Sequence, residues 1–73
     1  MKEAPQTPRE WLLYALDAYN IAVLAEKDNF VEIEKGYVVE IESNGVFKLL
    51  SGGAVVAPFR DLEELCRFIE MSP

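Results

Sequence analysis

Three short segments that each end in glycine constrain the fold of this 73-residue chain more than any other feature. They read Glu34-Lys35-Gly36, Ser43-Asn44-Gly45 and Ser51-Gly52-Gly53, and apolar stretches flank each of them. A three-residue hairpin loop often combines a type I turn with a last residue in the left-handed region, which glycine tolerates best. The segments therefore predict a meander of four antiparallel strands.

The same loops predict which side chains share a face of the sheet. If each segment is a three-residue loop, Leu49 lies opposite Val55, and Glu40 lies opposite Lys48 as a favourable cross-strand pair. A slip of one residue would move every side chain to the other face, so the absence of charge from one face supports this register. The uncharged face contains Val31, Ile33, Tyr37, Val39, Ile41, Phe47, Leu49, Val55 and Ala57, and the other contains Phe30, Glu32, Val38, Glu40, Glu42, Val46, Lys48, Leu50, Ala54 and Val56.

A helix is predicted to begin at Thr7, after a loose polar lead-in of residues 1–6. Thr7 and Glu10 have the spacing of a capping box, in which each side chain accepts a hydrogen bond from the other's backbone. Pro8 fits the first helical position. The apolar run at 11–25 predicts that this helix continues to about Lys27, where Asp28-Asn29 ends it.

A second helix is predicted to begin at Asp61, an N-cap residue with Glu64 three residues further on. The chain is therefore expected to be a single α+β domain over residues 7–73. An N-terminal helix precedes a four-stranded antiparallel meander sheet, a C-terminal helix follows, and both helices pack on the uncharged sheet face. The apolar stripe of the second helix consists of Leu62, Leu65, Cys66 and Ile69.

The first helix carries more apolar surface than its own chain is expected to cover. Its apolar arc spans roughly 230° on a helical wheel, about twice what a helix with one buried face needs. Self-association is a common way to stabilise so small a domain, so we expect a homodimer. The helix is favoured over the sheet, because Glu32, Glu40 and Glu42 would repel a second copy across the outer sheet face. The candidate interface residues are Trp11, Ala15, Ala18 and Ala22 on the helix and Val38, Leu50 and Val56 on the sheet.

The composition argues against several classes of function. A formal net charge of −6, with seven Lys and Arg residues that form no run, opposes binding to nucleic acids and to anionic membranes. The chain has no histidine, and its one cysteine, Cys66, lies in an apolar helical stripe. We therefore expect no catalytic residue, no cofactor and no metal site, and interpret Cys66 as a core residue. The alternating glutamates are interpreted as a solvated sheet face.

These features favour a small cytoplasmic, non-catalytic acidic protein that binds other proteins and forms a homodimer. The apolar run at 11–25 has the length of a signal-peptide core, but the acidic residues within and before it argue against one. Two alternatives stay open. One is a small-molecule-binding regulatory module with a pocket lined by Tyr14, Tyr19 and Tyr37. The other is an acidic inhibitor or nucleic-acid mimic with carboxylates spaced like phosphates.

Overall fold

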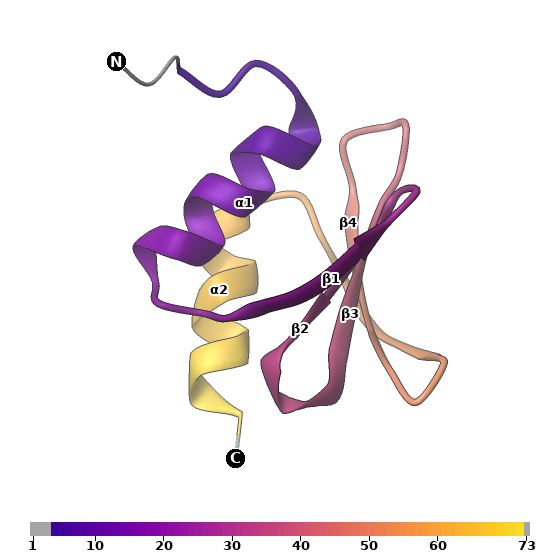
Figure 1. The fold of residues 1–73 in the computed structure, drawn as a ribbon. Helices are drawn as coiled ribbons and strands as arrows, with labels where there is room; N and C mark the ends of the chain where they lie inside the picture. The colour runs from indigo at the N-terminus through magenta and orange to yellow at the C-terminus, as the bar shows by residue number, and fades with distance from the viewer. Residues whose placement is uncertain (1–3, 73) are drawn as a thin grey trace.

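Within residues 4–72, which the computed structural model describes, the fold consists of a helix, a five-stranded antiparallel sheet and a second helix (Figure 1). Both helices lie on one side of the sheet, and the strands are neighbours in the order of the sequence. The α+β class is confirmed, with one strand more than predicted. The elements are α1 (Pro8–Ala18), β1 (Val23–Lys27), β2 (Phe30–Ile33), a 3-10 turn (Glu34–Gly36), β3 (Tyr37–Ile41), β4 (Phe47–Ser51), β5 (Ala54–Phe59) and α2 (Leu62–Met71).

The predicted start of α1 is confirmed. The backbone N–H of Glu10 donates to Thr7 Oγ1 (3.1 Å), and the backbone N–H of Thr7 donates to Glu10 Oε1 (3.1 Å). Pro8 is the first helical residue. Two leucines one turn apart, Leu12 and Leu16, are completely buried. The helix therefore enters the core along a narrow stripe.

The end of α1 is set by a Schellman motif, and the prediction that this helix continues to about Lys27 is wrong. Asn20 has a left-handed backbone (φ 59°), and its N–H donates to the carbonyl oxygen of Asp17 (3.0 Å). The N–H of Ile21 donates to the carbonyl oxygen of Leu16 (2.8 Å). Leu16 and Ile21 both belong to the hydrophobic core. An apolar contact between residues at these two positions commonly accompanies a Schellman motif.

The residues beyond this motif form β1, an edge strand that the four-strand prediction lacked. β1 pairs with β2 through a two-residue turn, Asp28-Asn29, with Lys27 opposite Phe30. Asp28 is left-handed (φ 54°), a conformation that Asp and Asn adopt more readily than most residues. A short apolar run fits a strand as well as a helix, so the turn residues on each side decide between them.

Substitutions of Asn20 test this end of α1. Asn20→Ala is expected to lower the free energy of unfolding by about 1 kcal/mol, because alanine is strained in the left-handed region. Asn20→Gly is expected to stay within about 0.5 kcal/mol of the parent or to exceed it, since glycine carries no such strain. Urea denaturation of the three proteins measures the difference. Equal stability of the alanine and glycine variants would contradict the left-handed assignment.

The register predicted for the middle of the sheet is confirmed. Val39 lies between Val31 and Leu49, its partners on the two neighbouring strands, and all three are completely buried. Glu40 lies opposite Lys48, as expected. The glycines that end the first two loops have φ values of 77° and 81°. The turn sequences therefore predict the pairing of β2, β3 and β4 correctly.

The connection between β4 and β5 differs from the prediction. Gly52-Gly53 forms a two-residue turn in which both φ values are positive (60° and 84°). Leu50 consequently lies opposite Val55, and Val56 is the extra residue of a bulge. Val55 therefore does not oppose Leu49 on the core face, and it is 54% exposed.

The hydrophobic core lies between the two helices and the inner face of the sheet. Side chains from α1, α2 and the three middle strands meet there, and Ile21 joins them from the connection after α1. Cys66 is completely buried among them, which confirms its assignment to the core. The core residues are Leu12, Leu16, Ile21, Val31, Ile33, Val39, Phe47, Leu49, Leu65, Cys66 and Ile69.

The C-terminal end of α2 is attached to the loop between β2 and β3. Lys35 Nζ donates to the carbonyl oxygens of Ile69 (2.8 Å) and Ser72 (2.9 Å). The Tyr37 hydroxyl donates to Ser72 Oγ (2.8 Å). A cation at the carbonyl end of a helix is favourable, so Lys35 holds α2 in place over the sheet.

Candidate functional site

The side of the sheet that faces away from the helices is the candidate site, because in the described part of the chain neither α1 nor α2 covers it (Figure 1). We call this surface the outer face. Antiparallel pairing arranges its side chains in two rows that cross the sheet from β1 to β5. The first row is Ala25, Glu32, Val38, Leu50 and Val55, and the second is Lys27, Phe30, Glu40, Lys48 and Pro58.

Apolar side chains are accessible across much of the outer face. Val38 and Leu50 are neighbours in the first row and are half-buried. Val56, in the bulge of β5, is 43% exposed, and Phe30 on β2 is 39% exposed. Of the three sheet residues of the predicted interface, Val38 and Leu50 therefore adjoin on this surface, and Val56 is exposed in the bulge of the next strand. Contiguous exposed apolar surface of this kind marks interaction sites.

The outer face carries charges of both signs. Lys48 Nζ lies 3.0 Å from Glu42 Oε2, and Lys48 lies directly opposite Glu40 on the neighbouring strand. The hydrogen bond to Glu42, followed by the negative charges of Glu42 and Glu40, raises the pKa of Lys48 above its ordinary value. The expected repulsion between copies was based on the carboxylates alone. Lys48 offsets part of that negative charge, and Lys27 adds a second cation to the same row.

The residues predicted for a helical interface do not form one continuous stripe. Trp11 and Ala18 are exposed on α1, whereas Ala15 is half-buried. Ala22 lies beyond the end of α1, and its backbone N–H donates to Glu34 Oε1 (2.7 Å). The predicted stripe of small residues required a helix that includes Ala22. Because α1 ends before Ala22, the full stripe does not form. The structure thus brings Val38 and Leu50 together on the sheet, and it separates Ala22 from the three helix candidates that remain on α1.

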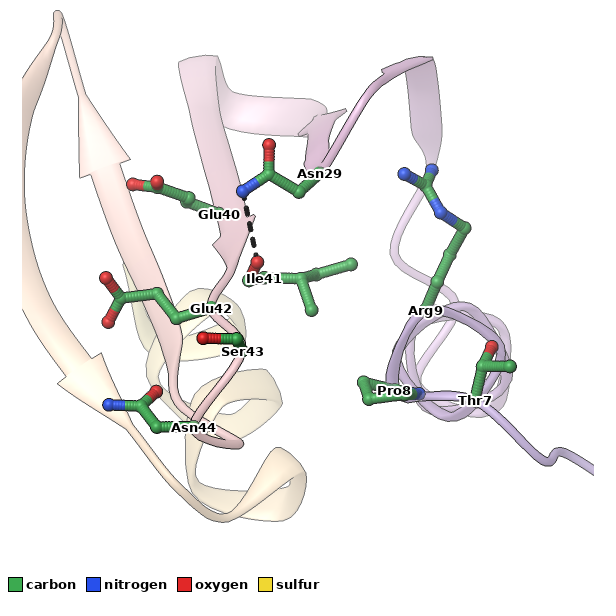
Figure 2. Close-up of a pocket in the computed structure, with 9 residues that line it drawn as sticks. All are labelled: Thr7, Pro8, Arg9, Asn29, Glu40, Ile41, Glu42, Ser43 and Asn44. Carbon is green, nitrogen blue, oxygen red and sulfur yellow. Dashed lines mark hydrogen bonds between the residues drawn. The ribbon is translucent and has the colours of Figure 1, made fainter.

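An open notch lies between the start of α1 and the end of β3 (Figure 2). The Ile41 side chain points across it toward α1, while Glu40 points to the other side of the sheet. Asn29 Nδ2 donates to the Ile41 carbonyl oxygen (3.1 Å), and Arg9 Nη1 lies 3.1 Å from Glu26 Oε1 on β1. Asn29 and Arg9 are thus engaged with neighbouring groups, and the polar side chains around the notch point in different directions.

The described residues do not provide an arrangement suited to metal binding. Among residues 4–72, no group of three or more His, Cys, Asp or Glu side chains could hold a metal ion. Burial, with a smaller contribution from the charge of Glu70, raises the pKa of Cys66 to about 11. Because the thiolate is the nucleophilic form, this buried and protonated thiol is unsuited to attack a substrate at neutral pH.

The three tyrosines of the small-molecule alternative lie in different environments. Tyr14 is exposed on α1 and lines a hollow to which the other two do not contribute. Tyr19 packs partly buried against the core at the end of α1. Tyr37 is bonded to Ser72 through its hydroxyl. This arrangement gives no support to a shared tyrosine pocket.

Sequence reasoning missed several residues of the outer face. Ala25 and Lys27 were expected in a helix, Val55 was assigned to the core face, and Pro58 was assigned to neither sheet face. The signal for the first two was Asp28-Asn29, which is a hairpin turn and not a helix end.

Two exposed surfaces bear on function: the outer face and the side of α1 that carries Trp11. Among the described residues, no helix is long and apolar enough to cross a membrane. No protein-family model matches the chain, and it shows no significant similarity to a curated protein or to a solved structure.

Proposed function

We propose that this protein is a non-catalytic protein-interaction module that forms a homodimer through the outer face of its sheet. The observation that supports this proposal is the row that crosses the sheet at Val38, Leu50 and Val55, whose apolar side chains no described element covers. Burying apolar surface on this face would add to the small core of the domain. Its one cysteine is a buried free thiol, which is compatible with the reducing cytoplasm.

A second copy fits the charges of this face. The second row contains Lys27 and Lys48 together with Glu40, so opposite charges are available when two identical surfaces meet. In a two-fold dimer each patch contacts its own copy and must be self-complementary. A uniformly acidic face would not satisfy this condition, whereas a face with both signs can.

The size of the face predicts a weak dimer. Five strands about 4.8 Å apart, each contributing about five residues of about 3.3 Å, give roughly 320 Å² in projection. Interfaces of standard size bury about 800 Å² of accessible surface on each partner, a quantity larger than the projected area of the same patch, and small interfaces belong to weak complexes. We therefore expect a dissociation constant in the micromolar range or above, and a monomer–dimer equilibrium that depends on concentration.

Sedimentation equilibrium from micromolar to about 0.5 mM protein tests this proposal. Leu50→Glu is expected to raise the dissociation constant at least about tenfold, because it buries a carboxylate without a partner in the interface. Val55→Glu should act in the same direction, and its more exposed position makes loss of the fold less of a concern.

Ala18→Glu is the matched control, since it places the same side chain at an exposed position of α1. It is expected to leave the dissociation constant unchanged. Circular dichroism establishes that each variant is folded. A parent chain that stays monomeric over the whole range, or a dimer that only Ala18→Glu disrupts, would overturn the proposal.

A further inference from the structure

The exposed side of α1 contains an aromatic pair that the dimer proposal does not use. Trp11 is 48% exposed and Tyr14 is 60% exposed, although both rings are large enough to contribute much to a core. Their centroids are 6.1 Å apart and their planes are nearly perpendicular (89°). The buried residues Leu12 and Leu16 hold this helix to the core, so the pair is presented on a fixed element.

The two rings border an open hollow whose described charged residues are acidic. Glu10, Tyr14 and Asp17 are spaced so that they share one face of α1, and Trp11 adjoins them. Ala4, Pro5 and Leu13 complete the lining, so Lys and Arg are missing from the described residues around the hollow. The surface thus combines exposed aromatic rings with negative charge.

We propose that this hollow binds an arginine side chain of a protein partner. The negative faces of aromatic rings attract cations, and arginine is found over them more often than lysine. Its planar guanidinium can stack on a ring while its N–H groups donate to a carboxylate such as that of Asp17. Because α1 lies on the other side of the sheet from the outer face, this site is independent of the proposed dimer (Figure 1).

The fluorescence of Trp11, the only tryptophan in the chain, reports binding at the hollow. The probe is the peptide acetyl-GRGRG-amide, compared with acetyl-GKGKG-amide and acetyl-GQGQG-amide. We expect the arginine peptide to shift the emission with a dissociation constant of about 1 mM, the lysine peptide to bind more weakly, and the glutamine peptide not to bind.

Substitutions at Tyr14 and Asp17 probe the two parts of the site. Tyr14→Ala is expected to weaken binding of the arginine peptide about threefold, and Tyr14→Phe to retain it, because the ring provides the contact. Asp17→Asn is expected to weaken binding by a similar factor. Asp28→Asn is the matched control: it makes the same change of charge in the β1–β2 turn, where asparagine accepts the left-handed backbone.

The outcomes separate this site from general attraction to an acidic protein. Equal weakening by Asp17→Asn and Asp28→Asn would show that only net charge matters and would overturn the proposal. So would the lack of any shift in Trp11 emission at about 10 mM arginine peptide. Sedimentation of Tyr14→Ala is expected to match the parent chain, so a failure of this site is distinguishable from a failure of the sheet-face dimer.

Discussion

Leu49→Ala is expected to remove most of the stability of this domain. Leu49 is completely buried at the centre of β4. Replacing a buried leucine by alanine typically costs about 2–5 kcal/mol. The net stability of so small a domain is on the order of 5 kcal/mol. Thermal unfolding should show a midpoint at least about 10 °C lower, or no cooperative transition at all.

Leu50→Ala is the matched control for this result. Leu50 is the next residue in β4 and points to the outer face, where it is half-buried. Measured at low micromolar concentration, its truncation is expected to cost less than about 1.5 kcal/mol, because less apolar surface returns to water. Equal losses at the two positions would mean that the outer face is as deeply buried as the core, which contradicts a weak dimer.

Local turn and capping chemistry made much of the fold predictable from the sequence. The capping box between Thr7 and Glu10 depends on residues three positions apart, and it forms as expected. The register of β3 and β4 depends on a loop that ends in Gly45, which has the required positive φ. Where a structural choice is made by neighbouring residues, the sequence contains the information that decides it.

The missed strand shows where this reasoning failed. Residues 21–25 continue the apolar run of the preceding helix, and no proline or glycine interrupts the chain before Lys27. The helix nevertheless ends at a Schellman motif whose left-handed residue is Asn20, a weaker signal than glycine. Burial of Ile21 against the core then directs the chain into β1. The choice between helix and strand for these residues depends on tertiary packing, which the spacing of apolar residues in the sequence does not show.

The candidate surface was predictable only in part, for a related reason. Val38, Leu50 and Val56 were assigned to the outer face from the register that three-residue loops imply. Val38 and Leu50 lie there, and Val56 lies in the bulge of β5. The helix was preferred because the carboxylates of the sheet face would repel a second copy. The helical stripe itself included Ala22, which lies beyond the end of α1. Predicting the balance of charge on the outer face also required knowledge of the contact between Lys48 and Glu42, which only the folded chain shows.

The stability of the protein is expected to fall between pH 9 and pH 11 because of Cys66. Burial raises the pKa of its thiol from an ordinary 9.0 to about 11. The folded chain therefore keeps this proton at a pH where the unfolded chain loses it. A raised folded-state pKa leaves stability intact below the unfolded value of 9.0 and reduces it as the pH rises toward 11. The difference between these two pKa values lowers the free energy of unfolding by at most about 3 kcal/mol.

Comparison with Cys66→Ala isolates this effect from the lysines and tyrosines that titrate in the same range. The variant is expected to be about 1 kcal/mol less stable at pH 7, since it loses buried volume. Above pH 9 its stability should fall less steeply than that of the parent, so that the two curves of unfolding free energy against pH converge or cross. Urea denaturation at half-unit steps from pH 7 to pH 11 measures both curves. Parallel curves, or rapid reaction of the folded parent with a thiol reagent at pH 8, would show that the Cys66 thiol is not held protonated in the core.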